Sequence, residues 1–181
     1  MSRSLSRREL LGGGVVLVGS SLPRLAAAAP RVGSAFPACS ARDLLEHRHT
    51  QRDLGQRRTF VCAITGQAAT EQMRHWLNNA EARFGRGGPI VALVALDVGP
   101  FAWDGVVWGQ AREHTPVWRH GYVWLDRDGG LQRALGLPDE GPLPWAYVVD
   151  RGGDVLAAHR GIASDPEAEA MWRLMAAPDA G

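Results

Sequence analysis

The stretch from residue 141 to residue 161, GPLPWAYVVDRGGDVLAAHRG, constrains the fold of this chain more than any other. Trp145–Val149 is a short run of apolar, aromatic and β-branched residues, which is typical of a buried strand. The Asp-Arg-Gly-Gly sequence that follows favours a tight turn, because its two glycines accept positive φ. Val155–Ala158 then returns as a second strand, so the stretch predicts a β-hairpin.

Pro144 stands at the entrance to this hairpin. Proline has no N–H to donate to a neighbouring strand, so we expect it at the mouth of the strand and not in its middle. An X-Pro bond at such a tight entry is one of the few places where a cis peptide bond is tolerated. We therefore expect the Leu143–Pro144 bond to be cis.

The pattern Pro-x-x-aromatic-Val-Val-Asp-x-x-Gly-x-Val, which begins at Pro144, resembles the cis-proline hairpin of thioredoxin-fold proteins. It is most similar to the exported TlpA-like and peroxiredoxin-like branch of that superfamily. The run from Tyr122 to Gly136 resembles the strand, turn and helix that precede this hairpin there. The resemblance implies an α/β fold over residues 58–177, in which helices flank both faces of a central mixed β-sheet.

The remaining elements follow from apolar runs and helix-end signals. Arg58–Ile64 predicts the first central strand, and Thr70 is expected to cap the helix that follows it. That helix has one apolar face, formed by Met73, Leu77, Ala80 and Phe84. Three further elements complete the thioredoxin order: a strand within 89–98, a crossover helix over 103–114 and a last helix opened by Asp165 and Pro166.

Residues 1–29 have the three-part layout of a signal peptide. Ser6-Arg7-Arg8-Glu9-Leu10-Leu11 resembles the twin-arginine export motif, and we expect cleavage after Ala28. The apolar run behind the motif is shorter than the ~20 residues needed to span a bilayer, so we expect no membrane segment in the mature chain.

The leader carries four arginines and one glutamate, which leaves a mature charge of about −2 from the formal +1. That balance argues against a nucleic-acid partner.

Residues 30–57 form an N-terminal extension of the predicted domain, and they show the weakest periodicity in the chain. His47 and His49 have the spacing of a metal pair, but the sequence offers no third ligand nearby, so we expect a solvated turn. Asp126-Arg127-Asp128-Gly129 begins like a calcium loop and lacks the later ligands, so it also predicts a turn. We therefore expect neither a metal nor another cofactor.

The redox centre of thioredoxin-fold enzymes is absent from the position that the resemblance assigns to it. There, a Cys-x-x-Cys pair follows the first central strand, where the end of a helix lowers the pKa of a thiol. The corresponding loop here, residues 65–70, reads Thr-Gly-Gln-Ala-Ala-Thr and contains no sulfur. This cysteine-free loop resembles that of YtfJ-like periplasmic proteins. The chain is not expected to act as a Cys-x-x-Cys oxidoreductase.

Two alternatives use the cysteines that the chain does have, Cys39 and Cys62. Thr59-Phe60-Val61-Cys62 matches the Thr-x-x-Cys of peroxiredoxins, which makes Cys62 a candidate peroxidatic thiol. Gly55 stands where that motif carries proline, and a thiol in the middle of a strand is usually an inert packing group. The second alternative is a Cys39–Cys62 pair, either as a structural disulfide in an oxidising compartment or as a redox couple.

The main hypothesis is an exported, periplasmic accessory protein of the cell envelope that binds a peptide or a protein without redox chemistry. Oxidoreductases of this fold hold extended peptides against the backbone that precedes the proline. The groove expected here is formed by two segments, the hairpin entrance and the cysteine-free loop: Leu143, Pro144, Trp145, Gly66 and Gln67.

Overall fold

The computed structural model describes residues 29–95, 104–138 and 141–178. Its centre is a mixed seven-stranded sheet with the strand order β2-β1-β5-β4-β3-β6-β7. Within it, β3, β4 and β5 run parallel, whereas β6, β7 and the β1–β2 pair are antiparallel to their neighbours. The strands are β1 Ser40–Asp43, β2 Arg48–Thr50, β3 Thr59–Ile64, β4 Ile90–Ala95, β5 Val123–Asp126, β6 Trp145–Val149 and β7 Val155–Arg160.

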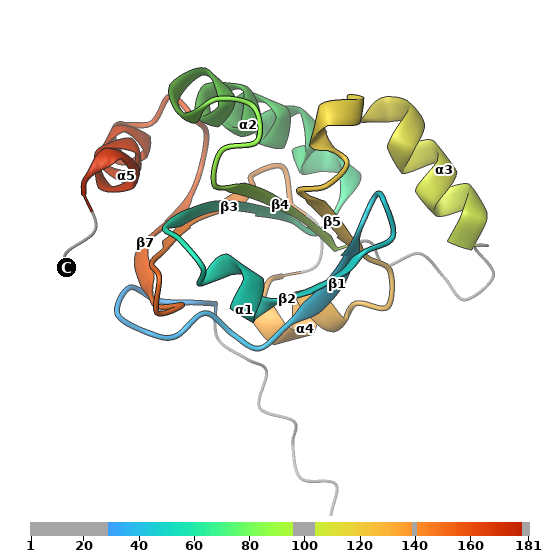
Figure 1. Ribbon diagram of the computed structural model, residues 1–181, viewed down its shortest axis with the longest axis horizontal. Helices are drawn as coiled ribbons and strands as arrows, with labels where there is room; N and C mark the ends of the chain where they lie inside the picture. The colour runs from blue at the N-terminus through green and yellow to red at the C-terminus, as the bar shows by residue number, and fades with distance from the viewer. Residues whose placement is uncertain (1–28, 96–103, 139–140, 179–181) are drawn as a thin grey trace, which may run out of the picture.

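Helices cover both faces of this sheet (Figure 1). The longer helices α2, α3 and α5 lie on one face, and the short helices α1 and α4 lie on the other. Their bounds are α1 Gln51–Leu54, α2 Thr70–Phe84, α3 Asp104–His114, α4 Gly130–Leu135 and α5 Pro166–Ala176. Two 3₁₀ turns, η1 Gln67–Ala69 and η2 Val117–Arg119, precede α2 and β5. The predicted fold class is confirmed by this three-layer arrangement.

Strand β3 is buried along its whole length and divides the core into two clusters. Successive side chains of a strand point to opposite faces. Phe60 and Cys62 therefore join the cluster beneath α2 and α5, whereas Val61 and Ala63 join the cluster beneath α1 and α4. A strand that is buried on both faces needs an almost continuous apolar sequence. This explains why the strand at residues 59–64 could be predicted from the sequence.

The β6–β7 hairpin forms as the sequence predicts. Its turn is closed by the Asp150 carboxylate, which accepts the backbone N–H groups of Gly152 and Asp154 at 2.7 and 2.9 Å. Gly153 has a φ of +89°, a left-handed conformation that glycine adopts without a steric penalty. Two local features, an Asx turn and one glycine, thus set the hairpin.

Helices α2 and α5 begin within one residue of the starts that the sequence predicts. Helix α2 begins at Thr70 itself, so Ala69 is its N-cap, and Thr70 makes no capping hydrogen bond. Helix α5 begins at Pro166 with Asp165 as its N-cap, as expected. Proline suits this first position because its missing N–H would have no partner inside the helix.

The N-terminal extension contributes two strands to the sheet. Ser40, Ala41 and Arg42 of β1 pair with Thr50, His49 and Arg48 of β2. The solvated turn expected at His47–His49 is correct only for His47, which lies between β1 and β2 with its side chain 70% exposed. His49 lies in β2, and both histidine rings contact the carboxylate of buried Asp43, at 3.2 and 3.0 Å. A buried carboxylate requires hydrogen-bond donors, and these two rings provide them.

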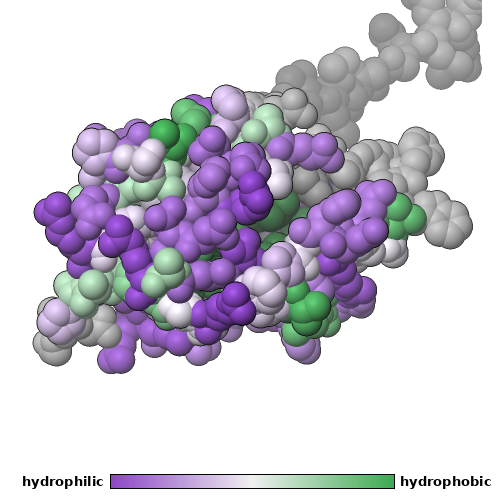
Figure 2. Space-filling view, turned by 90° about the horizontal axis from the view of Figure 1, so that it is seen from above, coloured by the Kyte–Doolittle hydropathy of each residue, from purple (hydrophilic) through white to green (hydrophobic). Residues whose placement is uncertain are grey.

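The surface over α2, α3 and α5 is mostly hydrophilic, with small separate apolar spots (Figure 2). In the residues the structure describes, no helix has the length and apolar character needed to cross a membrane. The predicted signal peptide, with Arg7, Arg8 and Ala28, lies outside the described residues.

Candidate functional site

The end of β3 and the start of β6 lie side by side at one end of these strands, and the residues of the predicted groove lie there. The two strands are antiparallel neighbours, with Ala63 directly opposite Trp145. The residues that follow β3 therefore lie beside those that precede β6. A hydrogen bond of 3.0 Å from the Thr65 hydroxyl to the Pro138 carbonyl also ties the two loops together.

The loop after β3 leads directly into the amino-terminal end of α2. Gly66 is buried and extended, Gln67 is exposed, and the 3₁₀ turn η1 continues into the helix. The free N–H groups of a helix start stabilise negative charge, and this is what activates a thiolate in redox proteins. Here that position offers amide, methyl and hydroxyl groups, so it has no nucleophilic sulfur to activate.

The hairpin entrance, which is the second segment of the predicted groove, differs from the expectation in one respect. The Leu143–Pro144 bond is trans, and no cis peptide bond occurs in the described parts of the chain. The trans form is favoured before proline unless packing selects the cis form. The expected cis proline is therefore wrong.

Pro144 is buried, whereas Pro142 and Leu143 are exposed in front of it. In the described residues, no hydrogen bond involves the backbone of Pro142 or Leu143. The backbone before β6 therefore presents free polar groups next to an exposed apolar side chain. An added extended segment needs both features, since main-chain hydrogen bonds hold it and side-chain contacts select it.

Arg160 adds a positive charge to this entrance. Its guanidinium lies over the ring of Trp145, 5.4 Å from the centroid, because the two residues are paired across β6 and β7. A Cβ atom on Gly141 would lie 2.9 Å from Nη2 of Arg160, so the cation reaches the segment in front of Pro144. Regular pairing counted from the turn would place His159 opposite Trp145, but a β-bulge between Val148 and Val149 shifts the register by one residue to Arg160. The sequence pattern alone therefore did not identify Arg160.

Cys62 lies in the middle of β3 and is fully buried. Burial raises the pKa of its thiol far above the ordinary value, which disfavours the thiolate that peroxide chemistry requires. Thr59, the other residue of the Thr-x-x-Cys motif, donates its hydroxyl proton to the carbonyl of Leu54 or Arg57. Residues three apart in a strand point to opposite faces, so Thr59 and Cys62 do not form a peroxidatic pair.

Cys39 is half-buried on the α1 and α4 side of the sheet, whereas Cys62 lies on the α2 side. Both are free thiols, so the proposed Cys39–Cys62 disulfide is not formed. The sheet between them is the physical reason. Burial, and then the negative charge of Asp126, raises the pKa of Cys39 to about 11. Neither thiol lies at the groove.

The described residues contain no group of three or more histidine, cysteine or acidic side chains placed to hold a metal ion. Asp126 instead accepts backbone N–H groups from Asp128 and Leu131, at 3.3 and 2.6 Å. This closes the turn into α4. Residues 126–129 thus form a turn, as predicted, and Asp126 stabilises it by accepting backbone N–H groups.

No profile of a known family and no curated protein matches the sequence. Solved structures do match the fold. A putative thiol:disulfide interchange protein DsbE from Chlorobium tepidum has a TM-score of 0.57 at 17% identity, covering 82% of this chain and 99% of that one. The pneumococcal exposed lipoprotein thioredoxin from Streptococcus pneumoniae has a TM-score of 0.54 at 12% identity, covering 76% and 98%.

A thiol peroxidase from Chromobacterium violaceum also matches, with a TM-score of 0.52 at 14% identity, covering 82% of this chain and 87% of that one. Identities this low establish the fold and no more. Together with the strand order and the helices on both faces, these matches show that the chain has the thioredoxin fold.

Proposed function

We propose that this thioredoxin-fold chain is an exported accessory protein that binds an extended peptide segment beside Pro144 and carries out no disulfide exchange. One observation carries the proposal: the end of β3 lies beside the start of β6, as in the predicted groove, while the loop that follows β3, residues 65–70, contains no sulfur. The two thiols of the chain lie in or against the core, away from that groove.

The exposed Leu143 side chain and the free backbone in front of Pro144 would receive the peptide. Main-chain hydrogen bonds would hold it, and Leu143 would contact an apolar side chain. Arg160 has its guanidinium over Trp145 and no carboxylate partner in the described residues, which favours a peptide with an acidic residue near the groove.

Binding can be tested with peptides selected from a random library on the immobilised protein and then measured by fluorescence anisotropy. Leu143→Asp should weaken binding at least tenfold, because it places a charge where an apolar contact is needed. Leu174→Asp is the matched control, since Leu174 on α5 is also 38% exposed and lies elsewhere. Failure to enrich any peptide, or equal affinity for both variants, would contradict the proposal.

Export is a separate part of the proposal and rests on the resemblance of Ser6–Leu11 to a twin-arginine signal. Arg7→Lys together with Arg8→Lys keeps the charge and removes the guanidinium pair, so precursor should accumulate in the cytoplasm. Immunoblots of cytoplasmic and periplasmic fractions would measure this. Normal processing of the double variant would point to the general secretory route.

A further inference from the structure

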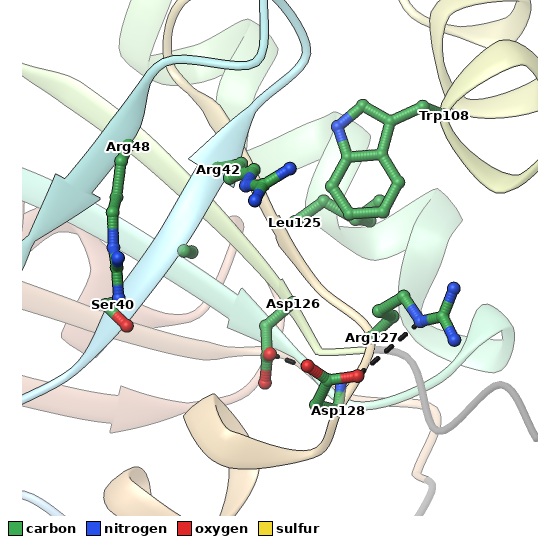
Figure 3. Close-up of a pocket in the computed structure, with 9 residues that line it drawn as sticks. Ser40, Arg42, Arg48, Trp108, Leu125, Asp126, Arg127 and Asp128 are labelled. Carbon is green, nitrogen blue, oxygen red and sulfur yellow. Dashed lines mark hydrogen bonds and ion pairs between the residues drawn. The ribbon is translucent and has the colours of Figure 1, made fainter. Parts of the chain in front are cut away.

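A second hollow lies at the β1–β5 end of the sheet, separated from β6 by strands β4 and β3. It has a volume of about 420 Å³ and is open to solvent. Figure 3 shows Arg42 and Arg48 projecting from the neighbouring strands β1 and β2, with Trp108 of α3 on one side and Asp126 and Asp128 on another.

Arg42 and Arg48 are directly opposite each other in the antiparallel pair of β1 and β2. Side chains at opposed positions point to the same face, and like charges placed there repel. In the residues the structure describes, neither guanidinium makes a hydrogen bond or an ion pair. The chain thus places two arginines that have no ion-pair partner in the described residues on neighbouring strands at the rim of one pocket.

The acidic residues of the pocket do not neutralise these two cations. Asp128 pairs with Arg127, whose Nε lies 3.5 Å from its carboxylate. The oxygens of Asp126 accept backbone N–H groups at the start of α4. In the described residues neither carboxylate forms an ion pair with Arg42 or Arg48, so both guanidinium groups remain available to a ligand.

The remaining lining fits a small organic anion. Ser40, two residues before Arg42, lies on the same face of β1 and offers a hydroxyl group, while Leu125 and Trp108 give apolar surface. Guanidinium groups bind phosphate and carboxylate through paired N–H donors. We propose that this pocket binds a small ligand through a dianionic head group, a phosphomonoester or a pair of carboxylates, held between Arg42 and Arg48.

The two sources of such a head group can be separated by titration calorimetry at constant ionic strength. O-phospho-L-serine is the phosphomonoester probe and succinate is the dicarboxylate probe. We expect saturable binding of at least one of them. Arg42→Gln or Arg48→Gln should each raise its dissociation constant roughly tenfold, as expected for one charged hydrogen-bonding partner. Arg31→Gln, the same change at an exposed residue outside the pocket, should leave it unchanged.

Arg48→Glu is expected to raise the stability of the protein while it abolishes ligand binding. It converts the repelling pair into an attractive cross-strand pair with Arg42, so the ligand-free variant should unfold at a higher temperature than the wild type. The same variant should no longer bind either probe. The proposal is overturned if the wild type binds neither probe, if Arg48→Glu binds as well as the wild type, or if Arg31→Gln loses affinity equally.

Discussion

Asp43 is a buried residue that stabilises the N-terminal extension, residues 30–57, where the sequence showed the weakest periodicity. Its carboxylate accepts four hydrogen bonds, from the backbone of Leu45 and His47 and from the rings of His47 and His49. Burial acts to raise the pKa of Asp43, but the hydrogen bonds from His49, His47 and Leu45 outweigh it, and the pKa lies below its ordinary value. The residue therefore stays charged in the folded protein.

Asp43→Asn should lower the free energy of unfolding by about 1–3 kcal/mol at pH 7, because an amide cannot accept every bond that the carboxylate accepts. A lowered folded pKa gives stability that is present above the unfolded value of 3.8 and is lost as the pH falls through the folded pKa. Urea denaturation between pH 7 and pH 2 would measure the difference.

The advantage of the wild type over Asp43→Asn should hold down to about pH 4 and shrink below it. Asp154→Asn is the control, because Asp154 is exposed and its side chain makes no hydrogen bond in the described residues. A difference that stays constant to pH 2 would contradict this assignment of the charge.

Strand periodicity predicts which face of the sheet Cys62 occupies, but it does not predict the face of Cys39. Cys62 alternates with Val61 and Ala63, so the sequence alone places it on the same face as Phe60. Cys39 precedes a strand with no apolar run, and its face depends on how β1 joins β5. For that reason the sequence could not exclude a Cys39–Cys62 disulfide, whereas the structure places the two free thiols on opposite faces of the sheet.

At the scale of elements, the sequence predicted those whose signals are local. The β6–β7 hairpin rests on an apolar run and a turn aspartate, and α5 rests on an Asp-Pro start. The β1–β2 hairpin was missed because its residues are mostly polar and are held by Asp43 and the histidines. The cis form of Pro144 was also mispredicted, since tertiary packing selects the isomer.

Helix α5 is joined to the sheet at its carboxyl end by Arg58. Nη1 of this residue donates to the carbonyls of Leu174 and Ala177, at 2.6 and 2.5 Å. A cation at this end of a helix satisfies free carbonyls and interacts favourably with the helix dipole. Arg58 thus fastens the last turn of α5 to the start of β3.

Arg58→Gln should therefore loosen the end of α5 and lower the free energy of unfolding by about 1 kcal/mol. Hydrogen exchange followed by mass spectrometry should show faster exchange in residues 174–177. Arg57→Gln is the control, since Arg57 donates to Gly88 outside the helix. Unchanged exchange at the end of α5 would show that Arg58 does not hold it.

At the scale of the whole molecule, the fold separates its cysteines from the proposed binding groove. Cys62 lies beneath α2, Cys39 lies on the opposite side of the sheet, and the loop that faces Pro144 has neither. Disulfide exchange requires an accessible thiolate next to the bound substrate. Residues 65–70 therefore offer no thiolate for disulfide exchange beside Pro144.

The most direct test of this account is the rate of insulin reduction by dithiothreitol in the presence of the protein. We expect the wild-type chain to give the same rate as a variant with both Cys39→Ser and Cys62→Ser, and the same rate as buffer alone. A rate that the wild type raises above that of the double variant would show that these cysteines exchange disulfides. That result would contradict the central claim that this thioredoxin fold binds without redox chemistry.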